Sequence, residues 1–188
     1  MYRSKLRKRR GHSIAELGPA IFMVLLIMIF PMACLASLGM RYTLMFYAVR
    51  DAAREASRST QFITDASAYQ KSAKNRALQV VNLFSNGTGA NGLKLVSCNT
   101  YAHVINIGTG AITRYGPAAP IPAGIPIDPI NNVYNITVQV QALIEPLFEG
   151  GWGWTGYRSG AGIPGLTAPF PVTITCASMC EKPQGLHN

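Results

Sequence analysis

The pattern of hydrophobic positions is dominated by one long uncharged run near the N-terminus. Between Leu17 and Met40 there is no Asp, Glu, Lys or Arg over 24 consecutive positions. A helix rises about 1.5 Å per residue, so the run reaches roughly 36 Å, whereas a bilayer core of about 30 Å needs about 20 apolar residues. The run therefore predicts a membrane-spanning helix. Pro19 and Pro31 each remove one helical hydrogen bond, so we expect local loosening there.

Helical periodicity continues past this run to about residue 60. Ala48, Ala52 and Ala56 form a stripe of small residues at i, i+4 spacing. Two interpretations fit this stripe: close contact with a helix of another subunit, or packing against the protein's own domain. A second helix is expected next, capped by Thr64 or Asp65 and ending near residues 85–87. It is indicated by apolar residues at helical spacing, namely Ala66, Tyr69, Ala73, Ala77, Val80, Val81 and Phe84.

The period changes to two from Leu93 onward. The clearest strand is Tyr134–Ile144, in which the even-numbered positions are apolar and most odd-numbered positions are polar. Further strands are expected at Leu93–Cys98 and Tyr101–Ile107, around a turn at Asn99 and Thr100, and at Pro171–Cys180. Residues 109–129 and 150–169 are rich in Gly and Pro and are expected to form loops. The chain is therefore predicted to be α+β: a long N-terminal membrane-spanning helix, a second helix, and then a small antiparallel β-sheet domain.

The basic residues are concentrated before the apolar run. Six of the first ten residues are Lys or Arg, which predicts a cytoplasmic N-terminus and an extracytoplasmic C-terminal domain. The other 11 basic residues oppose 8 acidic ones, so the rest of the chain carries only about +3 of the formal +9. Because no basic patch with interleaved aromatics follows, the charge does not indicate nucleic-acid binding.

The residues at the junction of the basic cluster and the apolar run resemble a processing site. Gly11 is followed by His12-Ser13-Ile14-Ala15-Glu16. This spacing resembles type IV prepilins, in which a prepilin peptidase cuts after the glycine and a glutamate stands at mature position five. The string R-R-G-H-S-I-A-E-L-G-P, with R-Y-T-L-M-F-Y-A-V-R-D-A-A-R-E-A-S-R further on, is similar to TadE-like minor pseudopilins of tight-adherence (Flp, type IVb-like) pilus systems. The resemblance covers residues 9–58 most clearly.

The resemblance implies a structural or assembly component without catalytic activity or cofactor. It divides the chain into a leader (residues 1–11), a membrane helix with a juxtamembrane extension (12–60) and an exported domain (61–188). The implied partners are a prepilin peptidase, the inner-membrane assembly platform, other pilin subunits and membrane lipid. Glu16 is expected to pair with the amino terminus of a neighbouring subunit and to set its register. The alternative is an unprocessed, signal-anchored periplasmic binding or sensor domain.

The cysteines and aromatic residues of the exported domain complete the expectations. We expect a disulfide from Cys98 to Cys176 or Cys180, because an oxidising compartment allows it and residues four apart in a strand lie too far apart to pair. The spacing of Cys176, Cys180 and His187 matches no common zinc pattern, so no metal site is expected. The widely separated histidines and the missing catalytic motifs argue against an enzyme. Trp152 and Trp154 are expected either to dock a partner or to cover the sheet.

Overall fold

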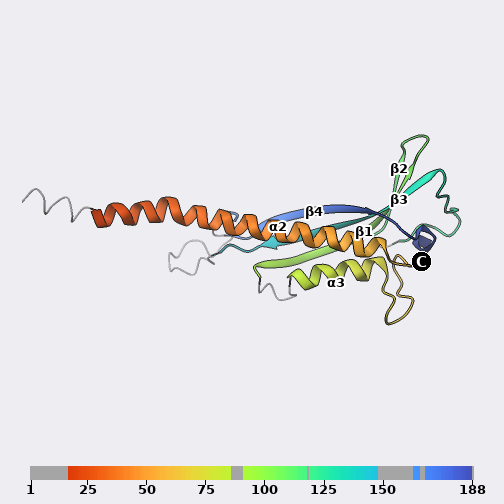
Figure 1. The fold of residues 1–188 in the computed structure, drawn as a ribbon, viewed down its shortest axis with the longest axis horizontal. Coiled ribbons are helices and arrows are strands. Elements are labelled where there is room, and N and C mark those ends of the chain that lie inside the picture. The colour runs from red at the N-terminus through yellow and green to blue at the C-terminus, as the bar shows by residue number, and fades with distance from the viewer. Residues whose placement is uncertain (1–16, 86–90, 118, 148–162, 166–167, 188) are drawn as a thin grey trace, which may run out of the picture.

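The structure, a computed structural model, confirms the α+β architecture. It describes residues 17–85, 91–117, 119–147, 163–165 and 168–187. Residues 17–24 are α-helical and are followed by a π-helical segment, η1 (Leu25–Ile29), and by α2 (Phe30–Ser57). The other elements are α3 (Ala73–Ser85), β1 (Leu93–Asn106), β2 (Ile112–Tyr115), β3 (Asn132–Ile144), β4 (Phe170–Met179) and a 3₁₀ turn, η2 (Pro183–His187). The long helix extends well beyond the folded domain at its N-terminal end (Figure 1).

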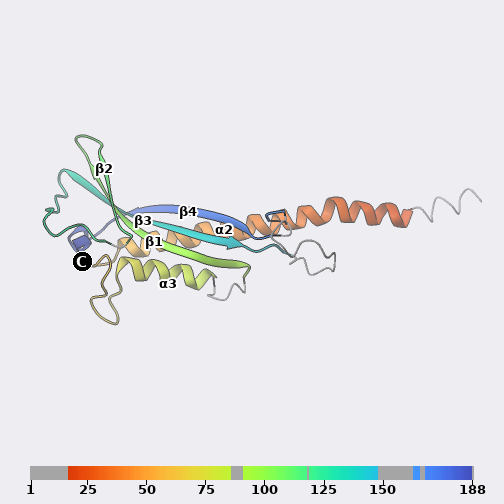
Figure 2. The same cartoon turned by 180° about the vertical axis from the view of Figure 1, so that it is seen from behind.

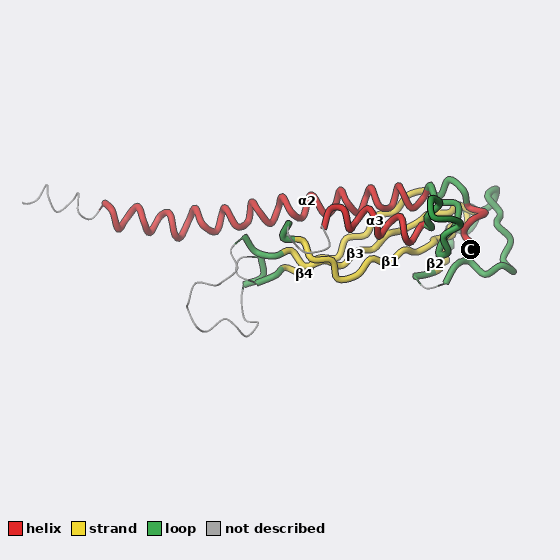
Figure 3. The backbone as a smooth tube through the Cα atoms, turned by 90° about the horizontal axis from the view of Figure 1, so that it is seen from below, coloured by secondary structure: helices red, strands yellow, loops and turns green. Residues whose placement is uncertain are grey.

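The domain consists of two layers. One is an antiparallel sheet with strand order β2-β1-β3-β4, and the other is formed by α2 and α3 (Figure 3). Seen from behind, the strands lie in front of both helices, so within the described residues the helices cover one face of the sheet only (Figure 2). The strands run along the length of α2. Leu93, Ile144 and Phe170 lie side by side at the end of the sheet that faces the N-terminal half of the helix.

The core lies between the layers and is built from alternate residues of β3. All six even-numbered residues from Tyr134 to Ile144 are buried, as their spacing predicted. The small residues of α2 and the apolar side of α3 pack on them as one cluster, which includes Ala52, Ala77 and Val81. On β4, Ile174 is buried, while Val172 and Cys176 pack against the cluster. The alternation in sequence thus sets the face that receives the helices.

Two expectations about the strands are wrong. Asn99 and Thr100 do not form a turn, because they pair with Gln139 and Val138 of β3 inside one unbroken strand. The irregularity lies earlier, where the register shifts between Leu95 and Ser97. The second error concerns residues 109–129, which include the short edge strand β2 as well as loop.

The predicted start of the second helix is also wrong. α3 begins at Ala73, and Tyr69, which was placed on its buried face, is 95% exposed. Asp65 still supports the helix, but from a distance along the chain. Its carboxylate accepts hydrogen bonds from the Ser72 backbone N–H (2.7 Å) and from Asn75 Nδ2 (3.0 Å), and Lys71 Nζ lies 3.2 Å away. The Ser72 bond above all, then that to Asn75, holds the pKa of Asp65 well below its usual range.

The C-terminal segment closes the end of the domain that lies far from the apolar helix. Cys180 N–H donates to the Tyr134 carbonyl (2.8 Å), and Glu181 N–H donates to the Ser57 carbonyl (3.0 Å) at the end of α2. Gly185 then passes so close to the backbone of Thr60 that a Cβ at this position would overlap the Thr60 carbonyl. Only glycine therefore allows this approach.

This contact predicts that Gly185→Ala destabilises the domain by about 1–3 kcal/mol, the usual cost of an overpacked site. Urea unfolding of the full-length protein in detergent, followed by near-UV circular dichroism, measures the change. Gly124→Ala is the matched control, because a Cβ there meets nothing within 4 Å. Equal stability of the two variants would show that η2 is not docked on Thr60.

Candidate membrane span and assembly surfaces

One helix, Leu17–Ser57 with 41 residues, is long and apolar enough to cross a membrane by length and composition. The large side chains from Leu17 to Phe30 are exposed, which distinguishes this helix from the core helix of a soluble domain. Lipid is a favourable environment for such a surface, because the exposed side chains are apolar. The backbone is also compatible with lipid, since a helix forms most of its hydrogen bonds internally. The fold is thus compatible with a single-pass membrane protein.

The helix is loosened where its second proline predicts it. Pro31 has no N–H to offer to the carbonyl of Ile27. Directly before it, the hydrogen bonds lengthen to π-helical spacing, and Phe30 N–H donates to the Leu25 carbonyl, five residues back. The expected irregularity near Pro31 therefore takes the form of a π-helical segment at Leu25–Ile29 rather than a break.

The predicted processing and register residues, Gly11, His12 and Glu16, lie outside the described residues. The same holds for Trp152 and Trp154. The roles of these five positions remain predictions from the sequence.

The alanine stripe faces the protein's own domain. Ala48, Ala52 and Ala56 are each fully buried, and Ala52 and Ala56 belong to the core cluster together with β3 and α3. Alanine carries no atoms beyond Cβ, so it lets the helix approach the sheet closely while keeping core density. Of the two interpretations of the stripe, the structure supports packing within the chain.

The outward face of α2 changes character along its length. Near the apolar run it carries the exposed side chains of Met40, Leu44 and Tyr47, and we call this set the outer apolar stripe. One to three turns further on, the same side carries Asp51, Arg54 and Arg58. Arg58 pairs with Glu55 (3.1 Å) and with Glu181 (3.5 Å), but these surface pairs contribute little to stability.

Arg41, the first charged residue after the apolar run, is held by the end of the sheet. Its Nη1 donates to the carbonyls of Glu145 and Pro146, just after β3. Gly92, at φ +68°, lies against the guanidinium, and a Cβ at Gly92 would overlap it. Sequence reasoning missed this contact, because the partners are backbone carbonyls about a hundred residues away.

The expected disulfide is not formed: Cys98, Cys176 and Cys180 are all free. The strand order explains this. Cys98 is opposite Val140 on one side of β3, and Cys176 is opposite Val138 on the other side. Two inter-strand spacings of about 4.8 Å separate their strands, which exceeds the roughly 7 Å that a disulfide can bridge. Cys180 lies further away, next to Tyr134 at the far end of the sheet.

The thiols of the domain are small packing side chains rather than nucleophiles: Cys180 is buried, and Cys98 and Cys176 are half-buried. Burial raises the pKa of Cys98 to about 11 and also raises the pKa values of Cys176 and Cys180. A thiol with a raised pKa is almost entirely protonated at neutral pH, and the thiolate is the reactive form. The cysteines therefore contribute packing.

The described residues contain no group of three or more His, Cys, Asp or Glu side chains that could hold a metal ion. His103 Nδ1 lies 3.4 Å from Thr137 Oγ1, and burial, followed by the charge of Arg114, lowers the pKa of His103. The guanidinium of Arg114 stacks on the ring of Tyr101 at 3.5 Å. These residues contact one another on the face of the sheet that lies opposite the helices.

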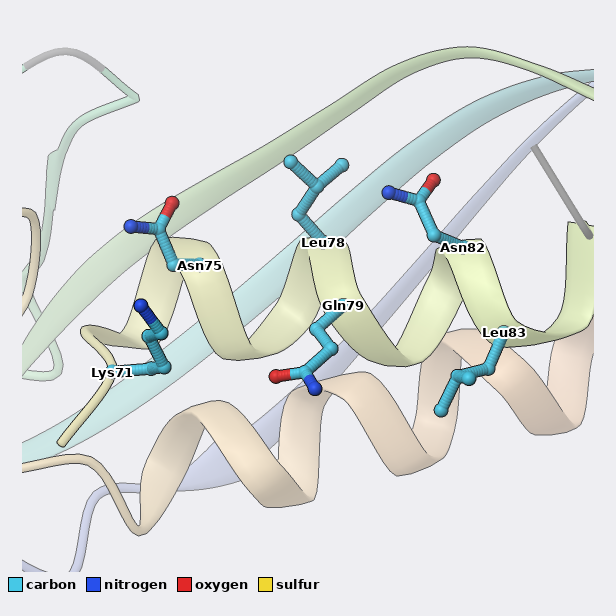
Figure 4. A pocket seen from close by; sticks show the side chains of 6 residues that line it. All are labelled: Lys71, Asn75, Leu78, Gln79, Asn82 and Leu83. Carbon is cyan, nitrogen blue, oxygen red and sulfur yellow. The ribbon is translucent and has the colours of Figure 1, made fainter. Parts of the chain in front are cut away.

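A surface depression along α3 has no catalytic composition. Its lining consists of amide, apolar and lysine side chains (Figure 4), namely Lys71, Asn75, Leu78, Gln79, Asn82 and Leu83. None of them is a carboxylate, a histidine or a thiol, so the depression holds no acid–base pair or nucleophile.

Comparison of the chain with protein-family models, with curated proteins and with solved structures found no match.

The free thiols give a direct prediction. In denaturant, all four cysteines should react with a maleimide without prior reduction. In the native protein, labelling of Cys98 should be slow near neutral pH and should accelerate about tenfold per pH unit between pH 8 and 10, because its pKa is raised by burial. Mass spectrometry after timed labelling measures both effects, and Cys98→Ser identifies the signal. Additional thiols released by a reductant would contradict the structure.

Proposed function

We propose that this protein is a membrane-anchored minor pseudopilin of the TadE-like kind, a structural and assembly subunit of a tight-adherence pilus. A prepilin peptidase would remove residues 1–11 on the cytoplasmic side. The helix would hold the subunit in the bacterial inner membrane, with the α+β domain on the extracytoplasmic side. Its other partners would be the assembly platform and neighbouring pilin subunits.

The observation that carries this proposal is the position of Gly11 and Glu16. They are five residues apart and stand between a cluster of six basic residues and the apolar run. An ordinary secretory signal has a shorter apolar segment, followed by a cleavage site with small residues. A glycine before the apolar segment, with an acidic residue at its edge, instead fits cleavage at the cytoplasmic surface.

The arrangement of α2 supports a subunit that uses one side of its helix for contacts. The inner side is occupied by the sheet and α3, whereas the outer apolar stripe is exposed just beyond the uncharged run. Leu44 and Tyr47 lie on one face, because they are three residues apart in a helix. A neighbouring subunit would find apolar surface there and charged surface further out.

The second candidate is an unprocessed, signal-anchored binding or sensor domain. It is favoured by the burial of the alanine stripe, because Ala48, Ala52 and Ala56 are then not available for contact with a helix of another subunit. It is also favoured by the uncovered sheet face, which presents hydrogen-bonding side chains such as Ser97 and Gln141, joined at 3.2 Å. The state of the N-terminus separates the two candidates.

We therefore expect the mature protein to begin at His12. Intact-mass measurement of membrane-extracted protein, from cells with and without the peptidase, gives the terminus. Gly11→Leu should retain the full leader, because a large side chain blocks the site. Gly18→Leu is the matched control, since a Cβ at Gly18 meets nothing within 4 Å. Retention of Met1–Gly11 in both strains would favour the signal-anchored candidate.

A second prediction concerns Glu16. A carboxylate costs roughly 2.5–3.5 kcal/mol at the centre of a membrane helix and less at its edge, so the expected pairing of Glu16 rests on the resemblance to prepilins. Cleavage after Gly11 would create an amino terminus that a neighbouring Glu16 can bind. Glu16→Gln keeps the shape and removes the charge, so abundance and processing should be normal, while crosslinks to pilin partners and surface fibres should be lost. Lys74→Gln, which removes a charge from the exposed side of α3, away from the outer apolar stripe, should assemble normally. Normal assembly of the Gln variant would remove the role assigned to Glu16.

A further inference from the structure

The domain begins to cover the apolar helix before that helix is long enough to cross a bilayer. Most side chains from Leu17 to Ala33 are exposed, but Cys34 is only 1% exposed. From Leu17 to Cys34 the helix rises about 26 Å at 1.5 Å per residue, compared with a hydrocarbon core of about 30 Å. Any tilt shortens this rise further.

One turn beyond Cys34, the helix contacts the described segment of the domain around Gly165. The segment at Gly165 passes so close to the Leu38 side chain that a Cβ at Gly165 would overlap it. Leu38 also lies inside the uncharged run. A hydrocarbon core that starts at Leu17 would end after about 20 residues, near Ser37. The boundary therefore falls at the level of this contact.

The chain next to this contact exposes apolar side chains. Ile163 is 63% exposed and Leu147, which follows the end of β3, is 41% exposed. We call Leu147 together with residues 163–165 the membrane-proximal rim. Of the charged groups beside the rim, the guanidinium of Arg41 is satisfied by the Glu145 and Pro146 carbonyls, and the Glu145 carboxylate is placed at the level of the headgroups. A satisfied arginine at the interfacial level costs far less than one in the hydrocarbon.

We infer that the membrane-proximal rim inserts into the outer leaflet, so that the domain rests in the lipid interface rather than standing clear of it. The occupant of this surface is lipid, at the level of the glycerol and first acyl carbons. Insertion of Ile163 and Leu147 adds apolar burial to that of the helix, which favours insertion. The inference rests on the proposed membrane placement of the helix.

Tryptophan reporters in the full-length protein test it. Trp152 and Trp154 are first replaced by Phe, and one reporter is then introduced as Ile27→Trp (middle of the apolar run), Ile163→Trp (rim) or Ile130→Trp (83% exposed, in the segment before β3). Each variant is reconstituted into phosphatidylcholine vesicles that contain lipids brominated at a shallow or at a deep acyl position. Leu147→Trp is a second rim reporter, in case Ile163→Trp does not fold.

We expect deep bromines to quench the reporter at position 27 and shallow bromines to quench the reporters at 163 and 147, with emission shifted to shorter wavelength. The reporter at 130 should be unquenched. If position 27 is quenched while 163 and 147 behave like 130, the rim does not insert, and the span remains. If position 27 is itself unquenched, the proposed membrane placement fails and this inference fails with it.

Discussion

The contact between the small-residue face of α2 and the even-numbered face of β3 is the constraint on which the rest of the structure depends. Ala52 and Ala56 bring the helix close to the sheet, and Ile136, Val138 and Val140 supply the opposing surface. The same α2 continues through the π-helical segment into the exposed apolar run, without a loop between them. Since helix and sheet share one core, any force or orientation imposed on the apolar run is transmitted to the domain.

A second contact sets where the domain stops along the helix. Arg41 is fixed by carbonyls at the end of β3, and Gly92 leaves room for its guanidinium. The arginine thus serves a structural purpose that a freely solvated charge would not. It joins the start of β1, the end of β3 and the helix at one point, directly at the end of the uncharged run. Replacing Gly92 would disturb this junction twice, through its positive φ and through the space that the guanidinium occupies.

The sequence predicted those elements whose patterns are local and strongly periodic. The apolar run, the helical continuation and β3 follow from single periods that hold over ten or more residues.

The wrong or missing predictions have a different cause, because they depend on contacts between residues far apart in the chain. Asn99 and Thr100 have turn-like composition but are held in β1 by pairing with β3. β2 is an exposed edge strand of four residues and so carries no burial pattern. Asp65 supports α3 through a chain reversal, and Arg41 binds carbonyls about a hundred residues away. The disulfide was predicted from the oxidising compartment and from the spacing of the cysteines in the sequence. The strand order decides against it, because β3 lies between the strands that carry Cys98 and Cys176, and this order depends on the whole topology.

The same architecture restricts where a partner can bind. The inner side of α2 packs against the domain, so among the described residues of this helix the apolar run and the outer apolar stripe are the apolar surfaces that remain for contacts to other proteins. Inside lipid, large side chains such as those from Ile21 to Phe30 gain little from meeting one another, because acyl chains are equally apolar. Met40, Leu44 and Tyr47 gain hydrophobic burial only where they would otherwise contact water. With a hydrocarbon core that ends near Ser37, the outer apolar stripe lies outside it, so a contact at the stripe is favoured while the helix is still in the membrane, whereas a contact along the apolar run is not. In the proposed pilus, side chains of the apolar run would gain hydrophobic burial against a neighbouring subunit only once they leave the lipid, so this second contact would be coupled to extraction of the helix.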